Sequence, residues 1–345
     1  MDKNQKNIFV VLGVPRSGTS AIARGLKALG IDFGNDFVPS SQQWNPTGFW
    51  EDREITDNIN CGVLYALNYA WDSVSIIERT CQHDKKLSAL QNAARQVLEK
   101  RMQTTQSWGF KDPRTAKIIV FWQTVFASMN LNENYIITLR NPLSVAHSYH
   151  KLRHFDLETG LLLWLMHLVP AIDETHDKKR LIVSYEQLMQ APQLELQRMQ
   201  KAFDLSDTVP DEIKKYADGF LDPTLRHYQY TMADLCAHPA AKVVPLSITV
   251  YQLLLDVATD KILLQSPEFT RAWGHIKNEF NQLYPMFIYL DQLLKTNKQQ
   301  LRTIRSLKRS FLYKLFYPLH VLDDYLRIYR RKSREKRRLR KTYGW

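Results

Sequence analysis

The clearest signal of the fold is the stretch Ile8-Phe-Val-Val-Leu-Gly-Val14, followed by Pro15-Arg-Ser-Gly-Thr-Ser20. The first seven residues form a short, continuous apolar run, which is typical of a strand buried on both faces of a parallel sheet. Helical spacing of apolar residues then runs from Thr19 to Leu29 and ends at Gly30. A strand, a glycine-containing turn and a helix in this order predict the first unit of an α/β fold.

Further strands and helices alternate along the chain beyond this unit. Strands of this kind, separated by helices of ten or more residues, predict a central parallel sheet with helices on both faces. The irregular segment 34–60 is long for a compact domain, and such loops are usually functional. The additional strands are expected at Trp108–Lys111, Tyr135–Leu139 and Leu181–Ser184, and helices at Thr115–Met129, from Pro142 onward and at Leu157–Glu174.

Unusual residues follow three of the predicted strands, where ligands bind in doubly wound sheets. The first loop, Gly13-x-x-x-x-Gly18-Thr19-Ser20, has the spacing of a phosphate-binding loop, in which backbone N–H groups and a helix N-terminus face an anion. A nucleotide-triphosphate loop needs Lys where this chain has Thr19, and the loop's one cation is Arg16. The spacing therefore predicts an anion site of another kind; the alternative is an ordinary strand-to-helix turn.

Four motifs carry a resemblance to a known family. Gly13 to Ser20 resembles the 5′-phosphosulfate loop of sulfotransferases that use 3′-phosphoadenosine 5′-phosphosulfate (PAPS). Tyr135 to Pro142, with Ser148 farther along, resembles their 3′-phosphate site. The segments around Gly48-Phe49-Trp50-Glu51-Asp52 and Gly109-Phe110-Lys111-Asp112-Pro113-Arg114 are similar to those of bacterial sulfotransferases of carbohydrate-modifying systems. The resemblance spans roughly residues 8 to 230.

The resemblance implies two anion sites for the two charged ends of PAPS. It assigns Arg140 and Ser148 to the 3′-phosphate, although an arginine at a strand end and a serine in a helix are also ordinary surface features. A basic segment containing Arg226 and His227 is expected to return over the cofactor or the acceptor. The resemblance assigns five consecutive residues to the 5′ end: Arg16, Ser17, Gly18, Thr19 and Ser20.

The implied reaction moves a sulfuryl group to a hydroxyl of a polysaccharide, glycolipid or oligosaccharide by in-line displacement, in which positioning and electrostatics supply most of the catalysis. Arg16 and Lys111 are the candidates for stabilising the developing charge, so no metal is expected. Glu51 is the candidate general base. Asp112 is the rival, but Asp112-Pro113 also fits a helix cap.

The net charge of +12, from 47 basic and 35 acidic residues, lies almost wholly at the C-terminus. Residues 301–345 hold 15 Lys/Arg and 3 Asp/Glu, and the first 300 residues are neutral. The body therefore does not read as a nucleic-acid-binding domain, and no specific nucleic-acid partner is expected. The apolar and aromatic run from Phe311 to Leu322, followed by a polybasic stretch, predicts peripheral contact with anionic membrane; nucleic-acid binding and a solvated tail are the alternatives.

Three parts are expected along the chain: a sulfotransferase domain at 1–280, a helical, coiled-coil-like extension at 281–326 and a polybasic tail at 327–345. A heptad-like stripe, interrupted by the polar residues Asn297 and Lys308, is typical of a short coiled coil, with self-association through residues 290–315, or of a docked amphipathic helix. It runs through Leu290, Leu294, Asn297, Leu301, Ile304, Lys308, Phe311 and Leu315.

Cysteine and histidine usage bears on compartment and metal. Three unevenly spaced cysteines without a CxxC pair indicate a reducing compartment, so we expect a cytoplasmic protein, on the inner face of the membrane if the tail binds lipid. His147, His150 and His154 lie at helical spacing without a Cys or carboxylate cluster, which does not favour a metal site. The aromatic residues Trp44, Phe49, Trp50, Trp71 and Trp164 are expected to be core rather than a sugar-stacking platform.

Two other functions fit parts of the sequence. A P-loop kinase is disfavoured by the missing Lys at position 19 and by the lack of a carboxylate at the strand ends for Mg²⁺. A non-catalytic, membrane-associated scaffold would not need Arg16, Lys111 and Arg140 at three separate strand ends.

Overall fold

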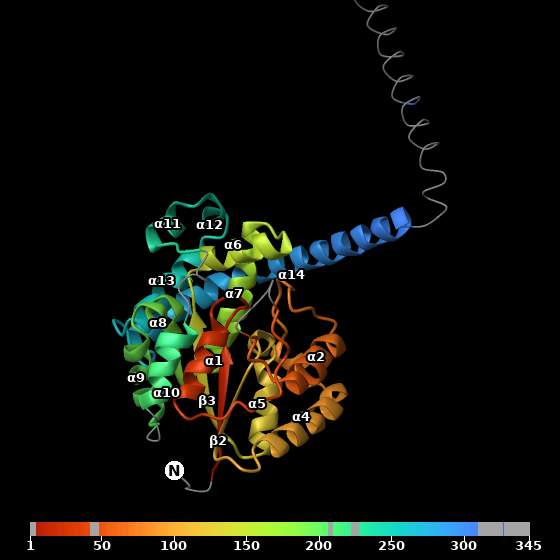
Figure 1. Ribbon diagram of the computed structural model, residues 1–345. Coiled ribbons are helices and arrows are strands. Elements are labelled where there is room, and N and C mark those ends of the chain that lie inside the picture. Colours follow the sequence, from red (N-terminus) through yellow and green to blue (C-terminus); the bar gives the residue numbers. More distant parts are fainter. Residues whose placement is uncertain (1–4, 42–47, 206–209, 222–227, 310–326, 328–345) are drawn as a thin grey trace, which may run out of the picture. The chain divides into compact units, whose positions relative to one another are not determined.

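The computed structural model describes residues 5–41, 48–205, 210–221, 228–309 and 327. Its centre is a four-stranded, fully parallel sheet of order β2-β1-β3-β4 (Figure 1). The strands are β1 (Asn7–Leu12), β2 (Ser107–Lys111), β3 (Asn132–Leu139) and β4 (Lys179–Ser184). The predicted α/β class with a parallel sheet is confirmed.

Helices cover both faces of the sheet, as the alternation of elements predicts (Figure 1). The helices are α1 (Thr19–Ala28), η1 (Glu54–Asn60), α2 (Cys61–Ala66), α3 (Arg79–Gln82), η2 (Lys85–Leu87), α4 (Ser88–Arg101), η3 (Pro113–Lys117), α5 (Ile119–Ser128), α6 (Pro142–Arg153), α7 (Leu157–Glu174), α8 (Tyr185–Gln190), α9 (Pro192–Phe203), α10 (Pro210–Lys215), η4 (Tyr216–Phe220), α11 (Met232–Ala237), α12 (Pro239–Val243), α13 (Leu246–Ala258) and α14 (Pro267–Arg309).

Alternate residues of each strand point to opposite layers of the core. Phe9 and Val11 of β1 pack with α1, α8 and α9 in one buried cluster. On the other face, Phe110 of β2 lies against α5, with ring centroids 4.8 Å from Trp122. Because both faces are buried, the inner part of each strand is mainly apolar. The carboxyl ends of the parallel strands meet at one edge of the sheet.

Several element boundaries differ from those expected, and strands β2, β3 and β4 begin one, three and two residues earlier. Strand β3 begins at Asn132 rather than Tyr135, because its polar first residues pair in register with β1, starting at Asn7↔Asn132. The helix expected from Thr115 is a short 3₁₀ turn, η3, followed by α5. The break fits the buried Lys117, whose Nζ donates to the carbonyl oxygen of Ser73 at 2.5 Å.

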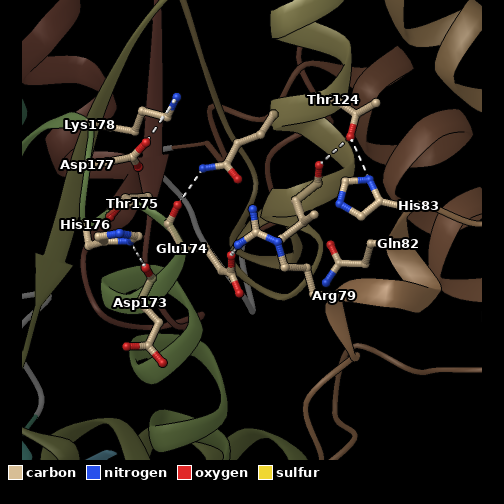
Figure 2. Close-up of polar contacts among 12 residues, drawn as sticks. Arg79, Gln82, His83, Thr124, Asp173, Glu174, Thr175, His176, Asp177 and Lys178 are labelled. Carbon is tan, nitrogen blue, oxygen red and sulfur yellow. Dashed lines mark hydrogen bonds and ion pairs between the residues drawn. The ribbon is translucent and has the colours of Figure 1, made fainter. Parts of the chain in front are cut away.

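Polar contacts fasten the segment after α2 to the helices beside the sheet, as Figure 2 shows. Arg79 of α3 pairs with Glu174 at the end of α7 at 2.5 Å, and Thr124 of α5 lies 3.4 Å from Nδ1 of His83. These contacts fix the path of residues 67–84, which lead from α2 to α4.

The chain divides into two compact units, Met1–Phe287 and Ile288–Trp345, and α14 contains the boundary. In the second unit, Leu301 and Ile304 of the heptad-like stripe are 45% and 46% exposed, and Phe311 and Leu315 lie outside the described residues. Self-association through this stripe stays a prediction.

Within the described ranges, no single helix is long and apolar enough to cross a membrane. Helices α6 and α7, bent by 119° relative to each other, meet the criterion only as a pair, on length and composition.

Candidate active site

The loop after β1 has the backbone of an anion cradle. Arg16 and Gly18 both have positive φ, at 74° and 94°, on either side of Ser17. Alternation of this kind turns successive N–H groups toward one point, and α1 begins directly afterwards at Thr19. The Ser17 hydroxyl donates to the carbonyl oxygen of Val14 at 2.7 Å, so that side chain stabilises the turn.

The last two residues of the loop motif face inward as well. Thr19 is 4% exposed and lies close to Gly13. Ser20 donates from Oγ to the carbonyl oxygen of Phe49 at 3.0 Å. This contact connects the loop to the segment that carries Glu51.

The end of β3 lies against this loop. Nη1 of Arg140 donates to the carbonyl oxygen of Arg16 at 2.8 Å, and Nη2 donates to that of Tyr228 at 3.1 Å. Nε of Arg16 donates to Oγ of Ser148 at 3.1 Å. The structure therefore brings together Arg16, Arg140 and Ser148, which the sequence assigned to two ends of one ligand.

Helix α6 holds Ser148 in this position. The Asn141 side chain accepts a hydrogen bond from the backbone N–H of Leu143 at 2.9 Å, and Pro142 occupies the first turn, so the predicted cap is confirmed. The backbone that follows Arg140 is thus fixed before the helix begins.

The guanidinium groups of Arg16 and Arg140 repel each other in a buried setting. Burial, followed by the charge of Arg140, lowers the pKa of Arg16. Two cations held close together against their repulsion form a site whose stability increases when an anion binds.

A second cluster lies around Glu51, and it pairs a carboxylate with two cations instead of holding cations close together. Oε1 of Glu51 accepts from Nζ of Lys111 at 2.6 Å, and Oε2 lies 3.4 Å from Nη2 of Arg114. Glu51 and Lys111 are 6% and 2% exposed. Burial raises the pKa of Glu51, and the charge of Lys111 opposes that rise. Glu51 is therefore a buried carboxylate kept ready to accept a proton.

The neighbouring carboxylates are committed to other contacts. Asp112 is fully buried; it caps η3 through the backbone N–H of Arg114 at 2.9 Å and accepts from Nδ2 of Asn60 at 2.8 Å. Asp52 accepts from Nε of Arg101 at 2.8 Å and from the backbone N–H of Ile55 at 3.1 Å. The geometry favours Glu51 over both as a proton acceptor.

A family model described as the sulfotransferase family matches residues 8–211. The chain belongs to the sulfotransferase family. This match contains every residue of the two clusters above except Tyr228, and the family assignment makes sulfuryl transfer the general reaction.

Two solved structures are similar to this sulfotransferase. The sulfotransferase domain from the Synechococcus PCC 7002 olefin synthase is 14% identical, covers 66% of this chain and 86% of its own, and has a TM-score of 0.38. The sulfotransferase domain from the curacin biosynthetic pathway is also 14% identical, covers 63% of this chain and 80% of its own, and has a TM-score of 0.39. No curated protein matches the chain in a sequence search.

Tyr185 belongs to the site of this sulfotransferase but was not predicted. Its ring occupies the space beside Gly18, where any Cβ would meet the ring atoms, and the Arg140 guanidinium lies 4.7 Å from the ring centroid. Tyr185 thus contacts both the loop after β1 and the end of β3. The available signal was its place directly after β4, at the same sheet edge as the predicted residues.

Arg114 was quoted in a motif but given no role, and its contact with Glu51 depends on the fold of the loop before η1. Arg226 and His227 lie outside the described residues. In the parts of the chain that the structure describes, no group of three or more His, Cys, Asp or Glu could hold a metal ion. His147 instead stacks on Tyr230, with ring centroids 5.0 Å apart.

Proposed function

We propose that this sulfotransferase uses PAPS as donor and a carbohydrate hydroxyl as acceptor. The observation that carries the donor assignment is the forced proximity of Arg16 and Arg140 beside the Ser148 hydroxyl. PAPS has one anionic group at each end of a nucleoside, so it needs two adjacent anion sites. The positive-φ loop and the Arg140–Ser148 pair supply them.

The residues fit this donor chemically. The loop offers backbone N–H groups, Arg16 and Arg140 offer guanidinium groups, and Ser148 offers a hydroxyl, so the set consists mainly of hydrogen-bond donors. When bound, PAPS supplies a sulfuryl group attached to a good leaving group, the 3′,5′-bisphosphate. Arg16 and Lys111 place positive charge where negative charge develops during transfer.

Glu51 takes the proton of the acceptor hydroxyl in this proposal. Burial raises the pKa of Glu51 and so favours proton uptake, while the charge of Lys111 opposes that rise and favours the carboxylate form. Once Glu51 is protonated, the attraction to Lys111 weakens, and the ammonium group can turn to the leaving oxygen. Base and cation are thus coupled in one buried pair.

Calorimetric titration with 3′-phosphoadenosine 5′-phosphate, beside ATP with Mg²⁺, tests the donor. Binding of the bisphosphate alone, lost in Arg140→Ala, is expected. Preference for ATP–Mg²⁺ would favour the kinase alternative, and binding of neither would favour the non-catalytic scaffold.

The C-terminal segment 311–345 is proposed to bring the enzyme to anionic lipid on the cytoplasmic side of the membrane. The support is its sequence, an apolar, aromatic run followed by ten Lys/Arg between Arg327 and Lys341. Deleting residues 311–345 is expected to abolish co-sedimentation with vesicles that contain phosphatidylserine. Unchanged sedimentation would refute the assignment.

A further inference from the structure

Three aromatic rings from separate segments meet beside the proposed donor site. Trp71 follows α2, Tyr149 lies in α6 and Phe155 lies between α6 and α7. The ring centroids of Tyr149 are 6.1 Å from Trp71 and 5.9 Å from Phe155, and those of Trp71 and Phe155 are 6.1 Å apart. We call these three residues the aromatic wall.

The aromatic wall is not ordinary core. Trp108, Trp122 and Trp164 are fully buried, whereas Trp71 and Phe155 are half-buried and keep part of their surface at the solvent boundary. Of the aromatic residues expected in the core, Trp164 is buried, Phe49, Trp50 and Trp71 are half-buried, and Trp44 lies outside the described residues. Polar contacts hold the backbone of the neighbouring segments: Nδ1 of His150 lies 2.8 Å from the carbonyl oxygen of Phe155, and Nζ of Lys117 donates to the carbonyl oxygen of Ser73 at 2.5 Å.

Tyr149 joins this wall to the catalytic loop. It directly follows Ser148, the hydrogen-bond partner of Arg16, and the charge of Arg16 opposes the rise that burial causes in the pKa of Tyr149. The residue is 2% exposed, and its hydroxyl has no hydrogen-bond partner among the residues that the structure describes. A buried hydroxyl without a partner costs about 1–3 kcal/mol, which a ligand group can recover.

Cations and carboxylates both lie around the wall. The Arg153 guanidinium lies 5.3 Å from the centroid of the Trp71 ring, and Lys151 lies in the same last turn of α6. Asp72, next to Trp71, raises the pKa of Tyr149 and is the one carboxylate among the groups that act on it. Flat rings beside Arg153 and Lys151 suit a sugar that carries an anionic group. The sugar ring stacks, its acid pairs with arginine, and its hydroxyls donate to Asp72 or to Asp156, which directly follows Phe155.

We infer that the aromatic wall is the acceptor subsite and that it takes an acidic sugar ring, such as a uronic acid. The inference rests on the proposed PAPS-dependent reaction and names its acceptor class. The wall lies beside Arg16, so a stacked sugar is held where its hydroxyl can approach the transferred group.

Two methyl glycosides that differ at one group test the inference. Transfer of ³⁵S from labelled PAPS to methyl β-D-glucuronide and methyl β-D-glucoside is measured as kcat/KM, and 3′-phosphoadenosine 5′-phosphate binding is measured by calorimetry. The glucuronide is expected to be preferred by about tenfold, since a charge-assisted pair to arginine is worth about 1.5–3 kcal/mol. Equal rates, a preference for the glucoside or transfer to neither while the bisphosphate binds would overturn the inference and leave the donor assignment standing.

Three variants locate the effect. Trp71→Ala is expected to lower kcat/KM for both glycosides by about tenfold, and Arg153→Gln to remove the preference for the glucuronide, each with bisphosphate affinity within twofold of wild type. Tyr149→Phe is expected to lower kcat/KM while the unfolding temperature stays equal or rises, because the hydroxyl it removes has no partner among the described residues. Wild-type kinetics in Trp71→Ala would overturn the inference.

Two control variants make the same kinds of substitution, an apolar side chain to alanine and an arginine to glutamine, at positions outside the aromatic wall. Leu194→Ala removes a side chain on α9 that is 65% exposed, and Arg95→Gln removes a charge on α4. Both are expected to leave the two glycoside rates unchanged. If the wild-type protein does not bind the bisphosphate, the donor proposal and the acceptor inference are both refuted.

Discussion

Replacement of Gly18 by alanine tests whether the loop after β1 and the end of β3 form one binding unit. A Cβ at this position would lie 2.7 Å from Cε2 of Tyr185 and closer still to Cδ2, where ordinary contact begins at 3.4 Å. The ring must therefore move by about 1 Å or the loop must change its path. The φ of 94° adds a cost of about 1–2 kcal/mol for a residue with a side chain.

Movement of the Tyr185 ring removes its contact with Arg140, 4.7 Å away. A desolvated cation–π contact is worth about 2 kcal/mol, so the affinity for 3′-phosphoadenosine 5′-phosphate should fall by about 30-fold in Gly18→Ala. The free energy of unfolding should fall by about 2 kcal/mol or more. Calorimetry and urea denaturation measure the two effects.

The matched control is Gly274→Ala in α14, where, apart from the neighbouring helix backbone, no heavy atom of the described residues lies within 4 Å of the added methyl group. This substitution should stabilise the helix by up to about 1 kcal/mol and leave bisphosphate affinity unchanged. In the double variant Gly18→Ala/Tyr185→Ala the clash is absent, so stability should partly return while affinity stays low. Wild-type affinity in Gly18→Ala would refute the linkage between the two anion sites.

Three further predictions follow from single contacts. Glu51→Gln should lower kcat by about 10²–10⁴-fold without changing bisphosphate affinity. In wild type, kcat/KM should be lost as the pH falls through the pKa of Glu51, which burial raises above its ordinary 4.5. A kcat/KM that stays constant down to pH 4.5 would contradict this role. Ser148→Ala should weaken bisphosphate binding by about tenfold, because its hydroxyl is held beside Arg16. Ser144→Ala, one turn earlier on the same helix, should not, because the Ser144 hydroxyl makes no hydrogen bond to Arg16 among the described residues. Calorimetry that finds both variants unchanged would remove Ser148 from the site. Burial lowers the pKa of His167, so at acidic pH the unfolded chain binds one proton more than the folded chain. The free energy of unfolding should therefore fall below about pH 6.5 by up to about 1.4 kcal/mol per pH unit. Urea denaturation between about pH 7.5 and 5.5 should show a smaller fall in His167→Gln, and equal slopes in the two proteins would contradict the assignment.

The sequence allowed prediction of the parts of the fold that local chemistry determines. The apolar runs predicted all four strands, and Asn141-Pro142 predicted the start of α6. Asp112-Pro113 was correctly weighed as a cap, because a side chain next to the backbone groups that it caps needs no long-range information.

Contacts between distant segments were beyond local reasoning. Tyr185 looks like any first residue of a helix until the fold places it against Gly18 and Arg140. The half-buried position of Trp71 likewise depends on Tyr149 and Phe155, which lie far along the chain. Residue type predicts burial on average, but whether a particular aromatic side chain is fully or only half buried depends on which segments pack around it.

In the proposed donor site, the loop after β1 contributes mostly backbone N–H groups, because the Ser17 and Ser20 hydroxyls make contacts within the protein and the turn depends on positive φ at Arg16 and Gly18. Such a site constrains the backbone conformation of the loop more strictly than the identity of its side chains. A distant relative can therefore differ at most residues of the loop and keep the same backbone conformation, provided that the two left-handed positions remain. A search of structures for a strand, two left-handed residues around one intervening residue, and a helix would recover members that a search of letters misses.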